Sequence, residues 1–220
     1  NCFTKVLIDS SGFPSSWVST IHVDQQDRVW ASLNGNLYKL ENNKWSYLTE
    51  YDSLGYQIQD FKSDSQGNLW IGTFQGLIKF DGTSFNLMNH QAVSSKMNIY
   101  NINIDNEDSL IIGCNGGLFR FSEPHWSIIQ PPVFQQPLCD IREWIVATIV
   151  TNDTSNIYGA WNVGLAIDNE TKFNFLRGSE FQMDTNRFQI NQLKYDNFEN
   201  LWIGTRFGEV IVYNHSGLNL

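Results

Sequence analysis

Single carboxylates recur at one fixed place in a repeated segment of this 220-residue chain. They are Asp24, Asp64, Asp105 and Asp196. Regularly repeated aspartates can indicate calcium, but a calcium loop needs several oxygen ligands at alternate positions and a closing glutamate. The segments that follow these residues lack that pattern. Asp side chains also accept hydrogen bonds from the backbone of their own turn, so we predict that these residues brace turns.

Other residue types that carry chemistry do not form an enzyme motif. The four histidines and three cysteines show neither His-x-x-x-His nor Cys-x-x-Cys spacing, so a zinc site is poorly supported. No Gly-x-Ser-x-Gly elbow and no glycine-rich phosphate loop occurs. We therefore expect no catalytic residue, no metal site and no cofactor.

Hydrolysis of a polysaccharide is the enzymatic alternative, and it needs at least two carboxylates in suitable geometry. Asp60 is the one acidic residue at the predicted inner-strand positions, and Glu143 could supply a second carboxylate. The polar residues of these inner strands are predicted to line an axial channel. The channel-lining candidates are His22, Asp60, Lys62 and Lys194.

A second set of residues suits binding better than catalysis. They lie in the predicted turns between second and third strands and in the segments between repeats, and they combine flat aromatic rings with amide side chains. Such surfaces suit a sugar, glycan or peptide, because rings give apolar stacking and amides give oriented hydrogen bonds. The predicted ligand-binding residues are Asn34, Tyr56, Phe74, Gln75, Asn115, Trp144, Asn162, Phe188, Arg206 and Phe207.

The elements that position these residues follow from an internal repeat. Its anchor position is occupied by Trp30, Trp70, Ile111, Tyr158 and Trp202, at spacings of 40, 41, 47 and 44 residues. Those spacings are typical of one propeller blade. The repeats cover approximately residues 12–48, 55–88, 97–129, 143–176 and 187–220. We predict that the anchor residues belong to the core.

Each repeat divides into four short extended runs separated by turn residues such as Asp-Gly. Run lengths and chain breakers argue against helices. The predicted fold is an all-β propeller of about five four-stranded antiparallel blades, forming a single domain over residues 1–220. Residues 1–9 are predicted to form an orphan outer strand, in which Phe3–Leu7 completes the last blade beside Val210–Tyr213. Gly217–Leu220 could instead begin a fourth strand of its own and compete for that place. The alternative is an arc of a larger ring, for example one with seven blades.

Composition narrows the partners and the compartment. The net charge of -9 opposes binding to a phosphate backbone, so nucleic acid is an unsuitable partner. No apolar run approaches the roughly 20 residues that span a bilayer. Cys114 and Cys139 are predicted to be small buried side chains. Cys2 is a candidate for lipid modification, which would tether the protein to a membrane.

The phrase Asp-x-x-Gly-x-Leu-Trp-Ile-Gly-Thr-x-x-Gly-Leu at Asp64–Leu77, largely repeated at Asp196–Gly208, resembles the two-component regulator propeller repeat. The resemblance implies a periplasmic or extracellular sensor propeller of a bacterial signalling protein, often one that responds to carbohydrate. It also implies a downstream membrane span, which would be a second possible tether. An envelope assembly module that binds a partner protein is the alternative, and a propeller glycosidase or lyase is the third hypothesis.

Overall fold

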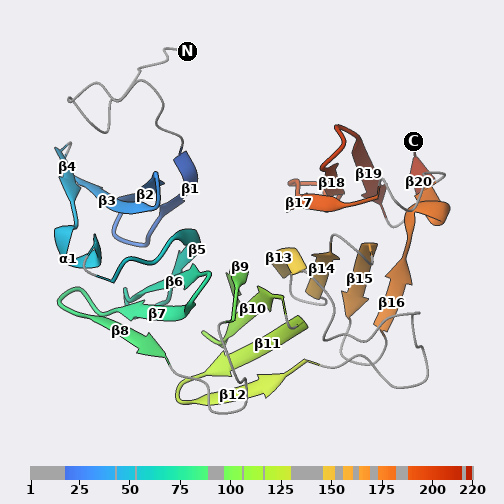
Figure 1. The fold of residues 1–220 in the computed structure, drawn as a ribbon. Coiled ribbons are helices and arrows are strands. Elements are labelled where there is room, and N and C mark those ends of the chain that lie inside the picture. Colours follow the sequence, from blue (N-terminus) through green and yellow to red (C-terminus); the bar gives the residue numbers. More distant parts are fainter. Residues whose placement is uncertain are drawn as a thin grey trace. The chain divides into compact units, whose positions relative to one another are not determined.

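The computed structural model describes most of the chain. The described residues are 18–42, 44–52, 54–88, 97–105, 107–115, 117–129, 146–151, 156–160, 164–168, 173–181, 188–214 and 217–219. The chain divides into two compact units, Asn1–Asn89 and His90–Leu220. Each unit is built from four-stranded antiparallel sheets (Figure 1).

The first unit contains two sheets, each a meander in which consecutive strands are neighbours. The first sheet, here called blade 1, contains β1 (Val18–Val23), β2 (Val29–Leu33), β3 (Asn36–Glu41) and β4 (Lys44–Tyr47). A four-residue helix, α1 (Thr49–Asp52), follows it. Blade 2 contains β5 (Ile58–Ser63), β6 (Leu69–Thr73), β7 (Gly76–Phe80) and β8 (Phe85–Met88).

The second unit contains three further sheets of the same topology. Blade 3 contains β9 (Ile99–Ile104), β10 (Leu110–Cys114), β11 (Gly117–Ser122) and β12 (His125–Ile128). Blade 4 contains β13 (Val146–Thr151), β14 (Asn156–Ala160), β15 (Gly164–Asp168) and β16 (Phe173–Leu176), and the 3-10 turn η3 (Gly178–Phe181) follows it. Blade 5 contains β17 (Ile190–Tyr195), β18 (Leu201–Thr205), β19 (Val210–Asn214) and β20 (Gly217–Asn219).

The five sheets confirm the predicted all-β, four-strand repeat, and each sheet falls within one predicted repeat. Among the described residues, no helix is long and apolar enough to cross a membrane.

The first turn of each well-described blade is held by the repeated aspartate, as predicted. In blade 2, Asp64 Oδ1 accepts the N–H groups of Gln66 and Asn68 at 3.0 and 2.8 Å. Its Oδ2 accepts the indole N–H of Trp70 at 2.8 Å. Asp24 and Asp196 make the same contacts in blades 1 and 5. The carboxylate therefore joins the turn to the anchor side chain, which lies six residues further along the hairpin.

Blades pack face to face, and this contact forms the core. In the first unit, Trp30 of blade 1 clusters with Ile58, Phe61 and Ile71 of blade 2. The ring of Trp30 also meets Phe80 edge to face, with centroids 6.0 Å apart. In the second unit, Ile157 and Leu165 of blade 4 cluster with the buried residues of blade 5. Cys114 is buried as predicted, whereas Cys2 and Cys139 lie outside the described residues.

Three expectations need correction. The outer edge of β19 pairs with β20, in the register Val212 with Asn219 and Tyr213 with Leu218, so the predicted place of Phe3–Leu7 is taken by the chain's own last strand. Residues 1–9 themselves lie outside the described residues. The sequence also argued against helices, but two short helical elements, α1 and η3, form turns between blades.

The third correction concerns the anchor residues. Trp30, Trp70, Ile111 and Tyr158 are at most 4% exposed, but Trp202 is 44% exposed. Trp30 packs against residues of the next blade as well as its own sheet, so an identical residue type in blade 5 need not be buried. Ile21 illustrates the same point in β1: it is 63% exposed, whereas Phe61, Ile102 and Leu193 at the same repeat position are buried.

Candidate ligand site

A pocket of about 190 Å³ lies in the first unit, where the β2–β3 turn of blade 1 meets the segment leading into blade 2. Two of the predicted ligand-binding residues, Asn34 and Tyr56, line it. Asn34 and Gly35 form the two-residue turn, with φ of 53° and 84°, the left-handed conformation that Asn and Gly tolerate best. The full lining is Asn34, Gly35, Asn36, Tyr51, Asp52, Gly55, Tyr56 and Gln57.

The opposite wall of the pocket is fixed by α1 and the residues that follow it. Tyr51 is 1% exposed, and its hydroxyl donates to the carbonyl oxygen of Tyr56 at 2.9 Å. Burial, with a smaller contribution from Tyr56, raises the pKa of Tyr51, so the hydroxyl stays protonated and remains a donor. Tyr47 donates a hydrogen bond to the carboxylate of Asp52. These contacts hold Tyr51 and Asp52 in place in the pocket wall.

The same junction between blades 4 and 5 is built differently. Phe188 stands at the repeat position of Tyr56, fourteen residues before the anchor. It is 2% exposed and stacks on Phe181 with ring centroids 4.6 Å apart. A Cβ added to Gly164, at the start of β15, would lie 3.3 Å from the Phe188 ring. Among the described residues, packed phenylalanines thus stand at the blade 4–5 junction where Tyr56 lines a pocket at the blade 1–2 junction.

The other predicted ligand-binding residues that the structure describes do not line this pocket. Phe188 is buried, which corrects its expected place on the ligand-binding surface. Phe74 and Gln75 form the β6–β7 turn, Asn115 follows β10, and Arg206 and Phe207 form the turn after β18. Phe207 is 50% exposed. Trp144 and Asn162 lie outside the described residues, as does Glu143.

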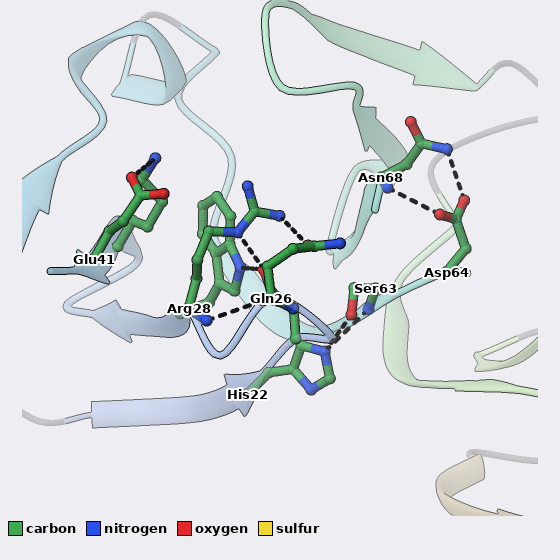
Figure 2. A network of polar contacts seen from close by, with 10 residues as sticks. His22, Gln26, Arg28, Glu41, Ser63, Asp64 and Asn68 are labelled. Atoms are coloured by element: carbon green, nitrogen blue, oxygen red, sulfur yellow. Dashed lines mark hydrogen bonds and ion pairs between the residues drawn. The ribbon is translucent and has the colours of Figure 1, made fainter. Parts of the chain in front are cut away.

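Three of the four channel-lining candidates come together in the first unit, on β1 and β5. Lys62 Nζ lies 3.5 Å from Asp60 Oδ1, and the hydroxyl of Thr20 donates to the same oxygen at 3.3 Å. His22 lies against Ser63, with 2.8 Å between Nε2 and Oγ (Figure 2). Lys194 is on β17 in the second unit. The carboxylate of Asp60 is therefore already engaged by Thr20 of β1 and by Lys62 of its own strand.

Sequence reasoning missed most of the pocket lining. The lining residues that were not predicted as site residues are Gly35, Asn36, Tyr51, Asp52, Gly55 and Gln57. Tyr51 and Asp52 belong to α1, which the strand-based repeat did not predict. The acidic residues Glu50 and Asp52 in Thr49–Asp52 are a helix-start signal that could have located this turn.

Comparisons with known proteins agree with this architecture. Residues 52–75 match the family model described as two component regulator propeller. These residues include Asp52, Gly55, Tyr56 and Gln57 of the pocket lining. No curated protein sequence matches the chain.

Several solved structures share the fold at low sequence identity. The extracellular domain of BT4673 from B. thetaiotaomicron aligns with a TM-score of 0.70 and 21% identity, over 90% of this chain and 27% of that chain. PorZ, a surface component of the type-IX secretion system of Porphyromonas gingivalis, aligns with 0.67 and 15%, over 89% and 32%. An inactive variant of virginiamycin B lyase from Staphylococcus aureus aligns with 0.66 and 11%, over 90% and 70%.

These structures support the fold alone, and the chain spans about a quarter of the BT4673 domain. The chain is thus a β-propeller of five blades, in which residues 52–75 match the two component regulator propeller model.

Proposed function

We propose that this chain is the ligand-binding part of an extracytoplasmic sensor, and that the pocket between blades 1 and 2 binds one small polar molecule such as a sugar residue. The observation that carries the proposal is the open pocket lined by Asn34 and Tyr56, at a junction whose counterpart between blades 4 and 5 is filled by Phe188.

The size and lining of the pocket indicate the class of ligand. A volume of about 190 Å³ is below the roughly 300–1,000 Å³ of sites that hold drug-sized molecules. It corresponds to roughly six water molecules at about 30 Å³ each. The lining offers the amides of Asn34, Asn36 and Gln57 beside the ring of Tyr56. Asp52 carries the only formal charge among the eight described lining residues, which favours neutral or cationic ligands over anionic ones.

The names of the structural neighbours support a sensing role. BT4673 is named in one structure as a one component system and in another as a hybrid two component system, in both cases through its extracellular domain. The matched family model is likewise named for two component regulators. We therefore propose a periplasmic or extracellular location, with signalling carried by other parts of the protein.

We further propose binding without turnover. Glycoside hydrolysis uses two carboxyl groups on either side of the bond, and Asp52 is the only carboxylate among the described residues of the pocket. Chromatography of the ligand after long incubation with the protein should recover it unchanged. Released product would reject this part of the proposal.

Calorimetric titration with neutral monosaccharides, uronic acids and short peptides tests the site. Tyr56→Ala removes the ring while leaving the backbone carbonyl that Tyr51 binds, and should abolish binding. Because the Tyr56 ring also packs against the core cluster of the first unit, a modest drop in the melting temperature is expected and is measured in parallel. Phe207→Ala removes an exposed turn aromatic in the second unit and is the control. Binding that survives Tyr56→Ala would move the site elsewhere, and tight binding of a peptide would favour the assembly hypothesis.

A further inference from the structure

The first two blades are joined at their inner strands by a histidine. His22, near the end of β1, places Nε2 2.8 Å from Ser63 Oγ and 3.1 Å from the backbone nitrogen of Ser63, at the end of β5 (Figure 2). β5 is the first strand of its sheet and pairs with β6 on one side only. The Ser63 N–H is therefore an edge group that finds its acceptor in the neighbouring blade.

The geometry fixes the protonation state of this nitrogen. A backbone N–H can only donate, so Nε2 must accept and must carry its lone pair. The Ser63 hydroxyl then donates to the same nitrogen, and the proton of the neutral ring is on Nδ1. A proton on Nε2 would point at the Ser63 N–H, and that donor would lose its acceptor.

The surroundings of His22 include some groups that disfavour its protonation and others that favour it. Burial disfavours the charged imidazolium, and Lys62 on β5 repels it. Asp24, which follows β1, and Asp60 on β5 attract it. The first pair outweighs the second, and the pKa of His22 lies below its usual 6.5. The edge of the Phe61 ring completes the contact from β5, with ring centroids 6.5 Å apart.

We propose that His22 is a proton-sensitive latch between blades 1 and 2: the neutral ring binds Ser63 across the junction, and protonation breaks that bond. The residues at the same repeat position in the other blades are Lys62, Asn103, Val150 and Lys194, and none of them is a histidine, the side-chain type suited to switching charge near neutral pH. The latch is thus specific to this junction, and it operates whether or not the pocket at the same junction binds a ligand.

The sign of the effect follows from proton linkage. Because the folded-state pKa is lowered, the unfolded chain binds more protons in the interval between the two values. The contribution of His22 is fully present above pH 6.5 and is lost as the pH falls below 6.5 toward the folded-state value. Each pH unit by which folding lowers the pKa of His22 corresponds to a tenfold loss in the folding equilibrium constant at low pH.

Two measurements on the unmodified protein test the latch. An NMR titration should place the pKa of His22 below 6.5. Hydrogen exchange should show that the protection factor of the Ser63 amide drops between pH 7 and pH 5. The amide of Asp64 is the internal control, since it donates to the Asn68 carbonyl at 3.0 Å within its own hairpin and should keep its protection factor.

A variant pair extends the test to stability. His22→Gln retains an acceptor without a titrating group, so the pH dependence of unfolding between 5 and 7 should become shallower. His125→Gln, at the exposed start of β12, should leave the profile of the original protein unchanged. Titration of His22 at or above 6.5, equal loss of protection at Ser63 and Asp64, or superimposable profiles of the original protein and His22→Gln would each overturn the proposal. If His22→Gln does not fold, the NMR and exchange results decide alone.

Discussion

Asp64→Ala is the sharpest test of the structural role assigned to the repeated aspartates. The Asp64 side chain accepts the N–H groups of Gln66 and Asn68 through Oδ1. Its Oδ2 accepts the amide of the Asn68 side chain and the indole N–H of Trp70, both at 2.8 Å. Alanine removes all four acceptor contacts without adding volume.

The expected cost is set by which donors water can reach. Gln66 is exposed and Asn68 is half-buried, so their donors can be rehydrated, whereas Trp70 is 4% exposed and its N–H would lose its partner inside the core. Leaving a buried donor unpaired costs about 1–3 kcal/mol, and a hydrogen bond to a charged group contributes about 1.5–3 kcal/mol. Because these contributions overlap, we expect a loss of about 3–4 kcal/mol in the free energy of unfolding.

Asp196→Ala is the matched control, since Asp196 makes the same set of contacts in blade 5. Its indole partner, Trp202, is 44% exposed, so water can replace the lost acceptor and the loss should be clearly smaller. Urea unfolding followed by circular dichroism gives both values. Equal losses in the two variants, or a loss below about 1 kcal/mol for Asp64→Ala, would refute the role of the buried indole bond.

Three further predictions concern stability. Trp70→Ala should cost about 3–5 kcal/mol in a urea titration, since it empties a buried anchor site; a loss under about 1 kcal/mol would contradict the core assignment. Gly164→Ala should lower the melting temperature far more than Gly82→Ala: both glycines have positive φ, but the new Cβ at Gly164 would lie 2.6 Å from the Leu176 carbonyl oxygen, whereas nothing lies within 4 Å at Gly82. Burial raises the pKa of Asp24, but hydrogen bonds from Trp30 and Arg28 outweigh it and hold that pKa below 3.8, so Asp24 stabilises the fold above pH 3.8 and loses this effect as the pH falls further. In Asp24→Asn the melting temperature should therefore fall less steeply as the pH drops below 3.8. A variant whose melting temperature falls as steeply as that of the original protein would reject the lowered pKa of Asp24.

The repeat made the fold predictable because the residues that recur in it contact one another within a single blade. Asp64 and Trp70 are six residues apart, and the hydrogen bond between them closes a single hairpin. Turn bracing and strand order depend on such short separations, so they are visible in one copy and confirmed by the next. Burial of Trp202 was mispredicted because it depends on packing against another blade, and a repeat pattern assigns the same environment to every copy.

Most of the pocket lining could not be predicted, for a related reason. Asn34 was expected because turn positions are fixed by the repeat, whereas Tyr51 and Asp52 lie in the segment between repeats, where the spacing varies from blade to blade. Whether that segment leaves a cavity depends on how its side chains pack: Tyr56 at one junction lines an open space, and Phe188 at the equivalent position is packed against Phe181. Packing differences of this kind are not visible in strand periodicity.

Blade 3 shows how the repeat keeps its turn when the anchor changes. Trp30 and Trp70 pair across the hairpin with Lys39 and Lys79, whose ammonium groups lie 5.9 and 5.1 Å from the indole centroids. In blade 3, Ile111 replaces the tryptophan and pairs with Arg120. The isoleucine side chain has no N–H to give to Asp105. Nη1 of Arg120 instead lies 3.0 Å from Asp105 Oδ2, an ion pair without hydrogen-bond geometry. The cation that lies over the ring in two blades is thus paired with the carboxylate in the third, where its charge offsets the burial of an Asp105 oxygen that no indole N–H reaches.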